Sequence, residues 1–238
     1  MSEVEPPAET GIERVVARAE REEIRLTRVI WCGNDGTVRA KSVTTPRLAA
    51  RMAGGISVTR AQQAQDALDR IAPLPGMGPV GELRLIPDAA TFRRLPYLPR
   101  TAGMLGDLVE QSGAPAAVCP RGFLRRMEAR LAEHRLAATA GFENEFTLAR
   151  VVEGGGVEPI DRSPCFSTTG ATASAEYVDA LLDALDAQGI AVDAAHAEGG
   201  PGQNEIALAP GPALRVADEQ VLVRETLRGV AGRFGLVA

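Results

Sequence analysis

The sequence has few of the residues that hold disulfide-rich or zinc-dependent domains together. It contains three cysteines among 238 residues: Cys32, Cys119 and Cys165. They lie far apart, show no CxxC spacing and are odd in number. This pattern favours free thiols in a reducing compartment over a disulfide framework or a zinc site.

Long apolar runs and basic clusters are also missing. No run approaches the ~18 apolar residues that a membrane span needs. The net charge is -5 and the basic residues are dispersed, which disfavours binding to nucleic acid or an anionic membrane surface. The acidic N-terminal segment MSEVEPPAETG is unlike a signal peptide. We therefore expect a cytoplasmic protein with no nucleic-acid or membrane partner.

The first half of the sequence is rich in strand and turn signals. Residues 1–23 are predicted to form a disordered leader that ends in a helix. A β-hairpin is predicted over residues 24–43, since Asn34-Asp35-Gly36 is a strong turn signal between two β-rich runs. Further predicted elements are a short helix (46–55), a possible helix (59–71) and strands (82–86, 101–110). Residues 24–112 are thus expected to form an α+β domain dominated by strands.

The composition then shifts towards longer helices. Apolar residues at helical spacing predict helices over residues 120–134, 173–188 and 213–234, with Glu176 near the start of the second. Strands are predicted within 136–150, 190–194 and 206–208. Residues 113–238 are expected to form a second domain.

Two glutamates two residues apart, Glu143 and Glu145, lie in the segment GFENEF. On a strand they share one face, with Cα atoms about 6.5 Å apart. Phe142, Asn144 and Phe146 are on the other face, where the aromatic residues are expected to pack in the core. Two carboxylates on one face repel unless a cation lies between them, and Mg²⁺ or Mn²⁺ would suit them. A solvated strand edge is the alternative explanation of the same pattern.

A second pair of acids encloses a loop rich in glycine. In AHAEGGPGQNEIAL, residues 195–208, short β-like runs flank the loop, so Glu198 and Glu205 are expected to approach each other across a hairpin. Gly199, Gly200 and Gly202 permit unusual backbone conformations, and the proline between them stiffens the turn. Four glutamates at the ends of strands are typical of a two-metal site for phosphoryl transfer.

Three polar residues accompany these acids. His196 shares a strand face with Glu198, but a lone histidine is more often structural than a metal ligand. It is therefore predicted, with Gln203 and Asn204, to bind substrate or to support the metal ligands.

Four segments, in order, resemble the glutamine synthetase family. EGGPGQNE is similar to its metal-binding loop and GFENEF to its E-x-E strand. VIWCGNDGTVRAKSV is similar to the hairpin of its N-terminal β-grasp domain. The segment from Pro87 to Ala102 is similar to its PD-x-x-T-x-R-x-x-P-x-x-P-x-T-A segment. The resemblance runs from about Ile24 to the end of the sequence.

The resemblance implies a fold and an activity. The fold would be a β-grasp-like domain followed by the first half of a catalytic α/β barrel, truncated. Members join the γ-carboxylate of glutamate to ammonia or an amine through a γ-glutamyl phosphate, with ATP as substrate and Mg²⁺ or Mn²⁺ as cofactor. Glu145, Glu198 and Glu205 would hold the metal on the glutamate side, and Glu143 would contribute to the metal that bridges the ATP phosphates.

The sequence also departs from the family pattern. Family chains continue for about as long again, and that part carries the N-G-S-G-x-H-x-H segment and the catalytic arginines, so no catalytic residue can be assigned here. The region GGISVTRAQQAQD lacks the ammonium-binding Asp-Gly-Ser-Ser turn, which favours the amine-ligase branches. A ring-shaped homo-oligomer is expected. The alternatives are a non-catalytic half that binds metal or other subunits, and an unrelated metal hydrolase.

Overall fold

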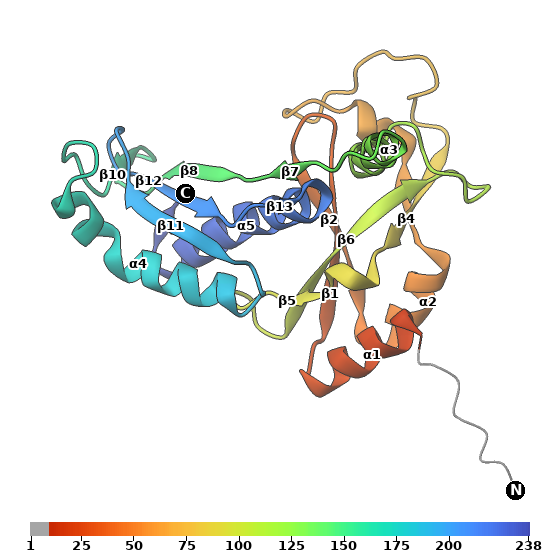
Figure 1. The fold of residues 1–238 in the computed structure, drawn as a ribbon, viewed down its shortest axis with the longest axis horizontal. Helices are drawn as coiled ribbons and strands as arrows, with labels where there is room; N and C mark the ends of the chain where they lie inside the picture. The colour runs from red at the N-terminus through yellow and green to blue at the C-terminus, as the bar shows by residue number, and fades with distance from the viewer. Residues whose placement is uncertain (1–9) are drawn as a thin grey trace, which may run out of the picture. The chain divides into compact units, whose positions relative to one another are not determined.

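The computed structural model describes residues 10–238, which form two compact units. Unit 1 comprises residues 10–94 and 100–123, and unit 2 comprises residues 95–99 and 124–238. Both units combine helices and strands (Figure 1), which confirms the predicted α+β class. The domain limit at residue 112 stays a prediction. The first nine residues of the predicted leader lie outside the described residues.

Unit 1 is built on a six-stranded sheet. Its strands are β1 (Leu26–Cys32), β2 (Val38–Thr44), β3 (Ile56–Thr59), β4 (Glu82–Pro87), β5 (Arg93–Arg94) and β6 (Thr101–Val109). The order is β2-β1-β6-β4-β3, with β5 also paired to β6. Only β1 and β6 run parallel. The predicted hairpin is therefore confirmed, and its first strand lies inside the sheet.

Helices α1 (Gly11–Arg21) and α2 (Leu48–Gly54) contribute to the apolar core of this unit. The first turn of α1 is closed by a capping box, in which Thr10 and Glu13 exchange side-chain to backbone hydrogen bonds. Val15 and Ala19 on α1 are buried in the core. The helix predicted for the leader is thus present, but it packs as part of the unit.

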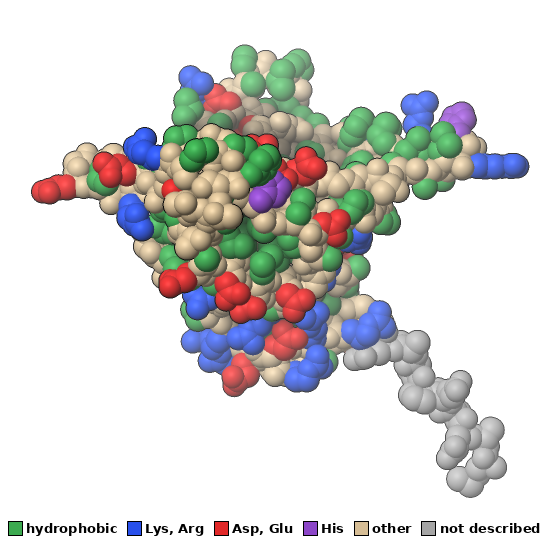
Figure 2. Space-filling view, turned by 60° about the vertical axis from the view of Figure 1, so that its left-hand side comes forward, with side chains coloured by type: hydrophobic (Ala, Val, Ile, Leu, Met, Phe, Trp, Pro, Cys, Tyr) green, Lys and Arg blue, Asp and Glu red, His purple; other side chains and the backbone are tan. Residues whose placement is uncertain are grey.

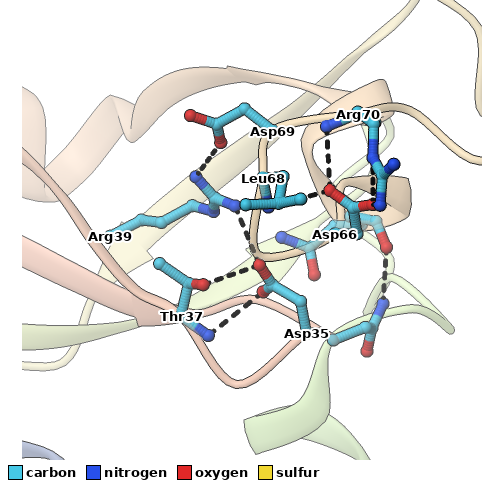
Figure 3. Close-up of polar contacts among 9 residues, drawn as sticks. Asp35, Thr37, Arg39, Asp66, Leu68, Asp69 and Arg70 are labelled. Carbon is cyan, nitrogen blue, oxygen red and sulfur yellow. Dashed lines mark hydrogen bonds and ion pairs between the residues drawn. The ribbon is translucent and has the colours of Figure 1, made fainter.

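The turn between β1 and β2 is held by a buried carboxylate (Figure 3). Asp35 accepts hydrogen bonds from the Thr37 amide at 3.1 Å, from the Thr37 hydroxyl at 2.6 Å and from Arg39 at 3.0 Å. Its side chain is 6% exposed. Arg39 also pairs with Asp69 at 2.9 Å. Burial would raise the pKa of Asp35, but the hydrogen bonds from Thr37 and the Arg39 charge lower it below its ordinary 3.8.

We expect Asp35→Asn to lower the free energy of unfolding by about 1–2 kcal/mol at neutral pH, because charge-assisted hydrogen bonds are lost. Because the folded pKa is depressed, this stabilisation is present above the unfolded pKa and is lost as the pH falls through the folded value. The difference in the free energy of unfolding between wild type and variant should therefore disappear at pH values below 3.8, the ordinary pKa of an aspartate. Urea unfolding of both proteins at several pH values measures this difference.

The control for this prediction is Asp69→Asn, since the Asp69 side chain is 71% exposed. An exposed ion pair contributes about 0–1 kcal/mol. A pH-independent effect of Asp35→Asn, or an equally large effect of the control, would contradict the account of the turn.

The predicted helix over residues 59–71 is wrong. A 3-10 turn spans Arg60–Ala64, and turns follow it. The Asp66 carboxylate accepts hydrogen bonds from the backbone amides of Leu68 and Arg70, at 2.9 and 3.0 Å. These amides would otherwise bond to carbonyls in a helix, so the aspartate favours the turn.

Unit 2 contains three small sheets and two long helices, in addition to most of α3 (Pro120–Glu133). The strands are β7 (Thr139–Ala140), β8 (Glu143–Thr147), β9 (Ala149–Val151), β10 (Val157–Pro159), β11 (Val192–Ala197), β12 (Gln203–Leu208), β13 (Gly211–Pro212) and β14 (Leu236–Val237). They form the sheets β11-β12-β8, β10-β9-β14 and β13-β7. The helices are α4 (Thr168–Asp186) and α5 (Ala213–Arg233). Among residues 10–238, no helix is long and apolar enough to cross a membrane.

One face of the β11-β12-β8 sheet is covered by helices. Ser174 on α4 donates a hydrogen bond to the Asn204 side chain at 2.8 Å. The Phe146 ring lies 5.9 Å from that of Tyr177 on α4. The buried Tyr177 hydroxyl donates to the Leu227 carbonyl on α5 at 3.0 Å. Figure 1 shows both helices beside these strands. Because the helices cover this face, the alternate side chains of each strand lie on the opposite face, away from the helices.

Two predictions for unit 2 are wrong in detail. Helix α4 begins five residues earlier than predicted, where Ser167 caps its first turn by accepting from the Thr169 amide. Glu176 therefore lies within the helix and not at its start. Phe142 was expected in the core but is 36% exposed, because β8 is an edge strand of the described sheet. Phe146 is half-buried and Asn144 is buried.

Candidate metal centre

The glycine-rich loop joins β11 to β12 as a tight hairpin. The Glu198 amide donates to the Gln203 carbonyl at 2.8 Å, and the Gln203 amide donates to the Gly200 carbonyl at 3.0 Å. Of the three loop glycines, only Gly202 has a left-handed backbone, with φ of 65°. Gly199 and Gly200 are permitted such a conformation but do not have a positive φ. The turn requires one such residue, which a side chain would strain.

Strand register places the acids on the face that the helices leave uncovered. His196 on β11 is directly opposite Glu205 on β12, and Glu205 is directly opposite Glu145 on β8. Glu143 is two residues from Glu145 and Glu198 is two residues from His196. Because side chains alternate across a strand, all five point to the same side of the sheet.

His196, Glu198 and Glu205 form the tightest group on this face. Their ligand atoms all lie within 4.8 Å of one another. His196 Nε2 is 3.1 Å from Glu198 Oε1 and 3.7 Å from Glu205 Oε2. The predicted approach of Glu198 and Glu205 across the hairpin is thus seen in the structure. In Figure 2, a histidine lies at the surface beside acidic and hydrophobic side chains.

Glu143 and Glu145 lie on the other side of Glu205, towards the edge of the sheet. Both are exposed. The Glu145 carboxylate accepts a hydrogen bond from Gln203 Nε2, and Gln203 Oε1 accepts from the Gly200 amide at 2.7 Å. Gln203 thus connects the hairpin loop to one of the predicted metal ligands.

The predicted role of Asn204, to bind substrate or to support the metal ligands, stays a prediction. Its side chain is on the face covered by α4, where it accepts from Ser174 at 2.8 Å and donates to the Gly202 carbonyl at 3.1 Å. It holds the hairpin loop in place, and it does not face the carboxylates. Alternation explains this, since Asn204 directly precedes Glu205 on the strand.

Glu205 is the most buried of the four acids, at 9% exposure. Burial raises its pKa. The charge of a protonated His196 would lower it, while the charges of Glu143, Glu198 and Glu145 raise it further. Negative charges collected around a buried carboxylate are costly unless a cation offsets them. Carboxylate oxygens with an imidazole nitrogen are donors that divalent cations accept, so the residues present fit a metal ion.

Cys165 and Phe166 lie next to this group of residues, and the sequence did not predict their position there. Cys165 Sγ lies 3.8 Å from Glu198 Oε2. Phe166 has a φ of 57°, its ring lies 5.4 Å from that of His196, and its amide donates to the Ala197 carbonyl at 3.2 Å. No local pattern marks these residues, because about 30 residues, including all of α4, separate them from the loop. Only their position beside β11 reveals them.

Comparison with protein families covers the whole described chain. Residues 10–116 match the glutamine synthetase N-terminal domain, and residues 117–238 match the glutamine synthetase catalytic domain. The sequence is similar to Gamma-glutamylpolyamine synthetase GlnA3 of Streptomyces coelicolor, with 35% identity over 204 residues. That match covers 84% of this chain and 44% of GlnA3.

Other relatives agree with this assignment. Glutamate--isopropylamine ligase of a Pseudomonas species is 27% identical over 165 residues, covering 66% of this chain and 36% of that protein. A solved structure described as a novel glutamine synthase homolog has 27% identity and a TM-score of 0.81, covering 100% of this chain and 51% of the other. The chain therefore spans about half the length of its relatives or less.

A structure described as a GmaS/ADP complex supports the fold alone, with 22% identity and a TM-score of 0.81 over 94% of this chain and 50% of that one. The predicted fold, an N-terminal glutamine synthetase domain followed by part of the catalytic domain, is confirmed. So is the predicted likeness to the amine-ligase branches, since relatives of that kind match. The chain belongs to the glutamine synthetase family.

Proposed function

We propose that this chain forms part of an ATP-dependent ligase that joins the γ-carboxylate of glutamate to ammonia or an amine. The observation that carries the proposal is the face of the β11-β12-β8 sheet, where four glutamates and a histidine gather in a domain of this family. A homo-oligomer and a cytoplasmic setting belong to the same proposal.

The names of the relatives favour an organic amine as the acceptor. They are described as synthetases or ligases for a polyamine, isopropylamine, an anilide and ethanolamine. Glutamine synthetases of mycobacteria match as well, at 32% identity over 152 residues. Ammonia therefore remains within the proposed range of acceptors.

The proposed reaction has two steps. In the first, the γ-phosphoryl group of ATP passes to an oxygen of the γ-carboxylate, and ADP leaves. In the second, the amine nitrogen attacks the acyl carbon, phosphate leaves with the oxygen that it carries, and the nitrogen loses a proton. The products are a γ-glutamyl amide, ADP and phosphate.

The part of this chain in the reaction is to hold divalent cations, Mg²⁺ or Mn²⁺. We propose Glu145, Glu198 and Glu205 as ligands on the glutamate side, and Glu143 as a contributor on the ATP side. A bound cation would offset the negative charge of the phosphates. Gln203 orients Glu145 through its hydrogen bond, and the hairpin brings Glu198 to Glu205.

The proposal is tested in the natural protein that contains this chain. ADP release is measured with glutamate and a panel of ammonia, isopropylamine, ethanolamine, aniline and a polyamine. Mass spectrometry identifies the γ-glutamyl amide. We expect ADP release that requires both glutamate and one member of the panel.

Two outcomes would contradict the proposal. ATP hydrolysis without a γ-glutamyl product would favour the hydrolase alternative. Metal binding without ADP release for any acceptor would favour a non-catalytic role in metal binding or subunit interaction.

A further inference from the structure

We propose that Phe166 is a specificity-determining residue for the acceptor. Its exposed ring binds the hydrocarbon part of an organic amine and thereby favours such amines over ammonia. This inference rests on the proposed function, in which the γ-carboxylate of glutamate is activated on the face of the β11-β12-β8 sheet that carries the four glutamates, here called the carboxylate face. It adds an apolar contact surface beside that face and leaves the proposed metal ligands unchanged.

Phe166 combines high exposure with a strained backbone. The residue is 68% exposed, so most of its ring contributes little to the hydrophobic stabilisation of the fold. Its φ of 57° is left-handed, and among residues 10–238 it is the only apolar residue other than glycine with such a φ. A bulky side chain is strained in this region, and strain of this kind gathers at functional sites. An exposed and strained aromatic residue therefore points to a role in binding.

The segment that carries Phe166 is fixed at three points. The Phe166 amide donates to the Ala197 carbonyl on β11 at 3.2 Å. Before it, the Ser163 amide donates to Asp161 Oδ2 at 2.9 Å. After it, Ser167 caps the first turn of α4. The ring is thus presented by a backbone that is already ordered, which lowers the cost of binding a ligand.

The ring lies at the margin of the carboxylate face. It packs against the His196 ring with centroids 5.4 Å apart and an interplanar angle of 58°. His196 Nε2 is 3.1 Å from Glu198 Oε1, and Sγ of the neighbouring Cys165 is 3.8 Å from Glu198 Oε2. A small molecule in contact with the exposed part of the Phe166 ring can therefore place its other end near this carboxylate.

Of the three proposed reactants, the organic amine suits this ring best. Glutamate and the phosphates of ATP are charged, and cations match them. Adenine could stack on a phenyl ring, but the ATP side of the proposed site is at Glu143 on β8. That strand lies two positions from β11 in the sheet, or about 10 Å. The hydrocarbon part of an amine gains contact with an apolar ring, whereas ammonia has no such part.

Kinetics of the natural protein that contains this chain test the role of Phe166. For the organic amines that the ADP-release panel identifies as acceptors, we expect Phe166→Ala to raise KM by about 10-fold, the lower end of the discrimination that an apolar contact gives. The KM values for ammonia, glutamate and ATP should stay unchanged. Phe166→Tyr, which keeps an aromatic ring, should behave as the wild type.

The matched control is Phe123→Ala. Phe123 is another exposed phenylalanine, at 54% exposure on α3. We expect its replacement to leave the KM of every acceptor unchanged. An equal effect of the two alanine variants would show that Phe166 has no special role.

Phe166→Gly separates recognition from a structural role. Glycine removes the ring and accepts the left-handed backbone without strain. We expect a raised KM for organic amines together with a thermal unfolding midpoint that is not lowered. A residue needed only for folding would give the opposite pattern, with a lowered midpoint and an unchanged preference for organic amines over ammonia.

Binding is also measured without turnover. The natural protein is labelled with 4-fluorophenylalanine, and the fluorine signal that is absent from Phe166→Tyr belongs to Phe166. The labelled protein is titrated with isopropylamine, aniline or ammonium chloride in the presence of glutamate, Mg²⁺ and a non-hydrolysable ATP analogue. We expect the Phe166 signal to shift with an organic amine and not with ammonium.

The outcomes separate this inference from the proposed function. Ammonia as the sole acceptor, an unchanged selectivity in Phe166→Ala, or a Phe166 signal that no organic amine shifts would overturn the role of the ring. A raised KM for ATP in its place would assign the ring to adenine and overturn it as well. If no acceptor supports ADP release, the proposed function fails, and the fluorine signal alone decides whether the ring binds amines.

Discussion

Replacing Glu205 with alanine is expected to weaken Mn²⁺ binding by about 100-fold or more, since loss of even a group that supports a ligand costs about 10–100-fold. Glu205 lies in the middle strand, directly opposite both His196 and Glu145. Its carboxylate is thus available to an ion on either side. Titration calorimetry with Mn²⁺ and Mg²⁺ measures the change.

The matched control is Glu176→Ala. Glu176 is an exposed glutamate within α4 and is not a member of the group formed by His196, Glu198 and Glu205. We expect its replacement to leave the Mn²⁺ affinity unchanged. Similar losses in the two variants would show that general charge, and not a site at Glu205, governs binding.

Folding provides a second control for Glu205. The isosteric variant Glu205→Gln removes one negative charge from a group of four, so repulsion within the metal-free protein falls. We expect it to lose the stabilisation that Mn²⁺ gives to the wild type while its metal-free unfolding midpoint is not lowered. A large drop in that midpoint would indicate a structural role for the carboxylate.

Replacing Gly202 with alanine is expected to lower the free energy of unfolding by about 3 kcal/mol. A Cβ at this position would lie 2.5 Å from the Leu148 carbonyl oxygen and 3.1 Å from Pro159 Cβ. The left-handed backbone, with φ of 65°, adds about 1–2 kcal/mol of strain. The crowding adds about 1–3 kcal/mol. Urea unfolding followed by circular dichroism measures the loss.

Gly199→Ala, in the same loop, is the control for this second prediction. Gly199 does not have a positive φ, and the nearest atom to an added Cβ is Cys165 Sγ at 3.8 Å, an ordinary contact. We expect a change within about 0.5 kcal/mol. If both variants were equally stable, the hairpin would not depend on the conformation of Gly202.

Much of the local structure could be predicted from short stretches of sequence. Asn34-Asp35-Gly36 marked the first hairpin, because such residues accept the backbone angles of a tight turn. The long helices followed from the spacing of apolar residues. The failed helix at residues 59–71 has a local cause, the hydrogen bonds of Asp66 to nearby amides, which compete with helix formation.

The candidate site also has some features that the sequence predicts and others that it does not. Spacing alone placed Glu143 with Glu145, and His196 with Glu198, because side chains two apart on a strand share a face. Flanking β-like runs predicted that Glu198 and Glu205 would approach each other. Which glycine needs a left-handed backbone could not be predicted, because that depends on how the loop packs against Leu148 and Pro159.

The sequence by itself determined the residue types, the turns and the alternation that put each acid on one face of its own strand. Only the tertiary structure decided that Glu145 is opposite Glu205, about 60 residues away, and that Phe166 packs on His196. The physical reason is that turns and alternation are set by neighbouring residues. Register between distant strands is chosen by packing, here of Phe146 and Asn204 against α4.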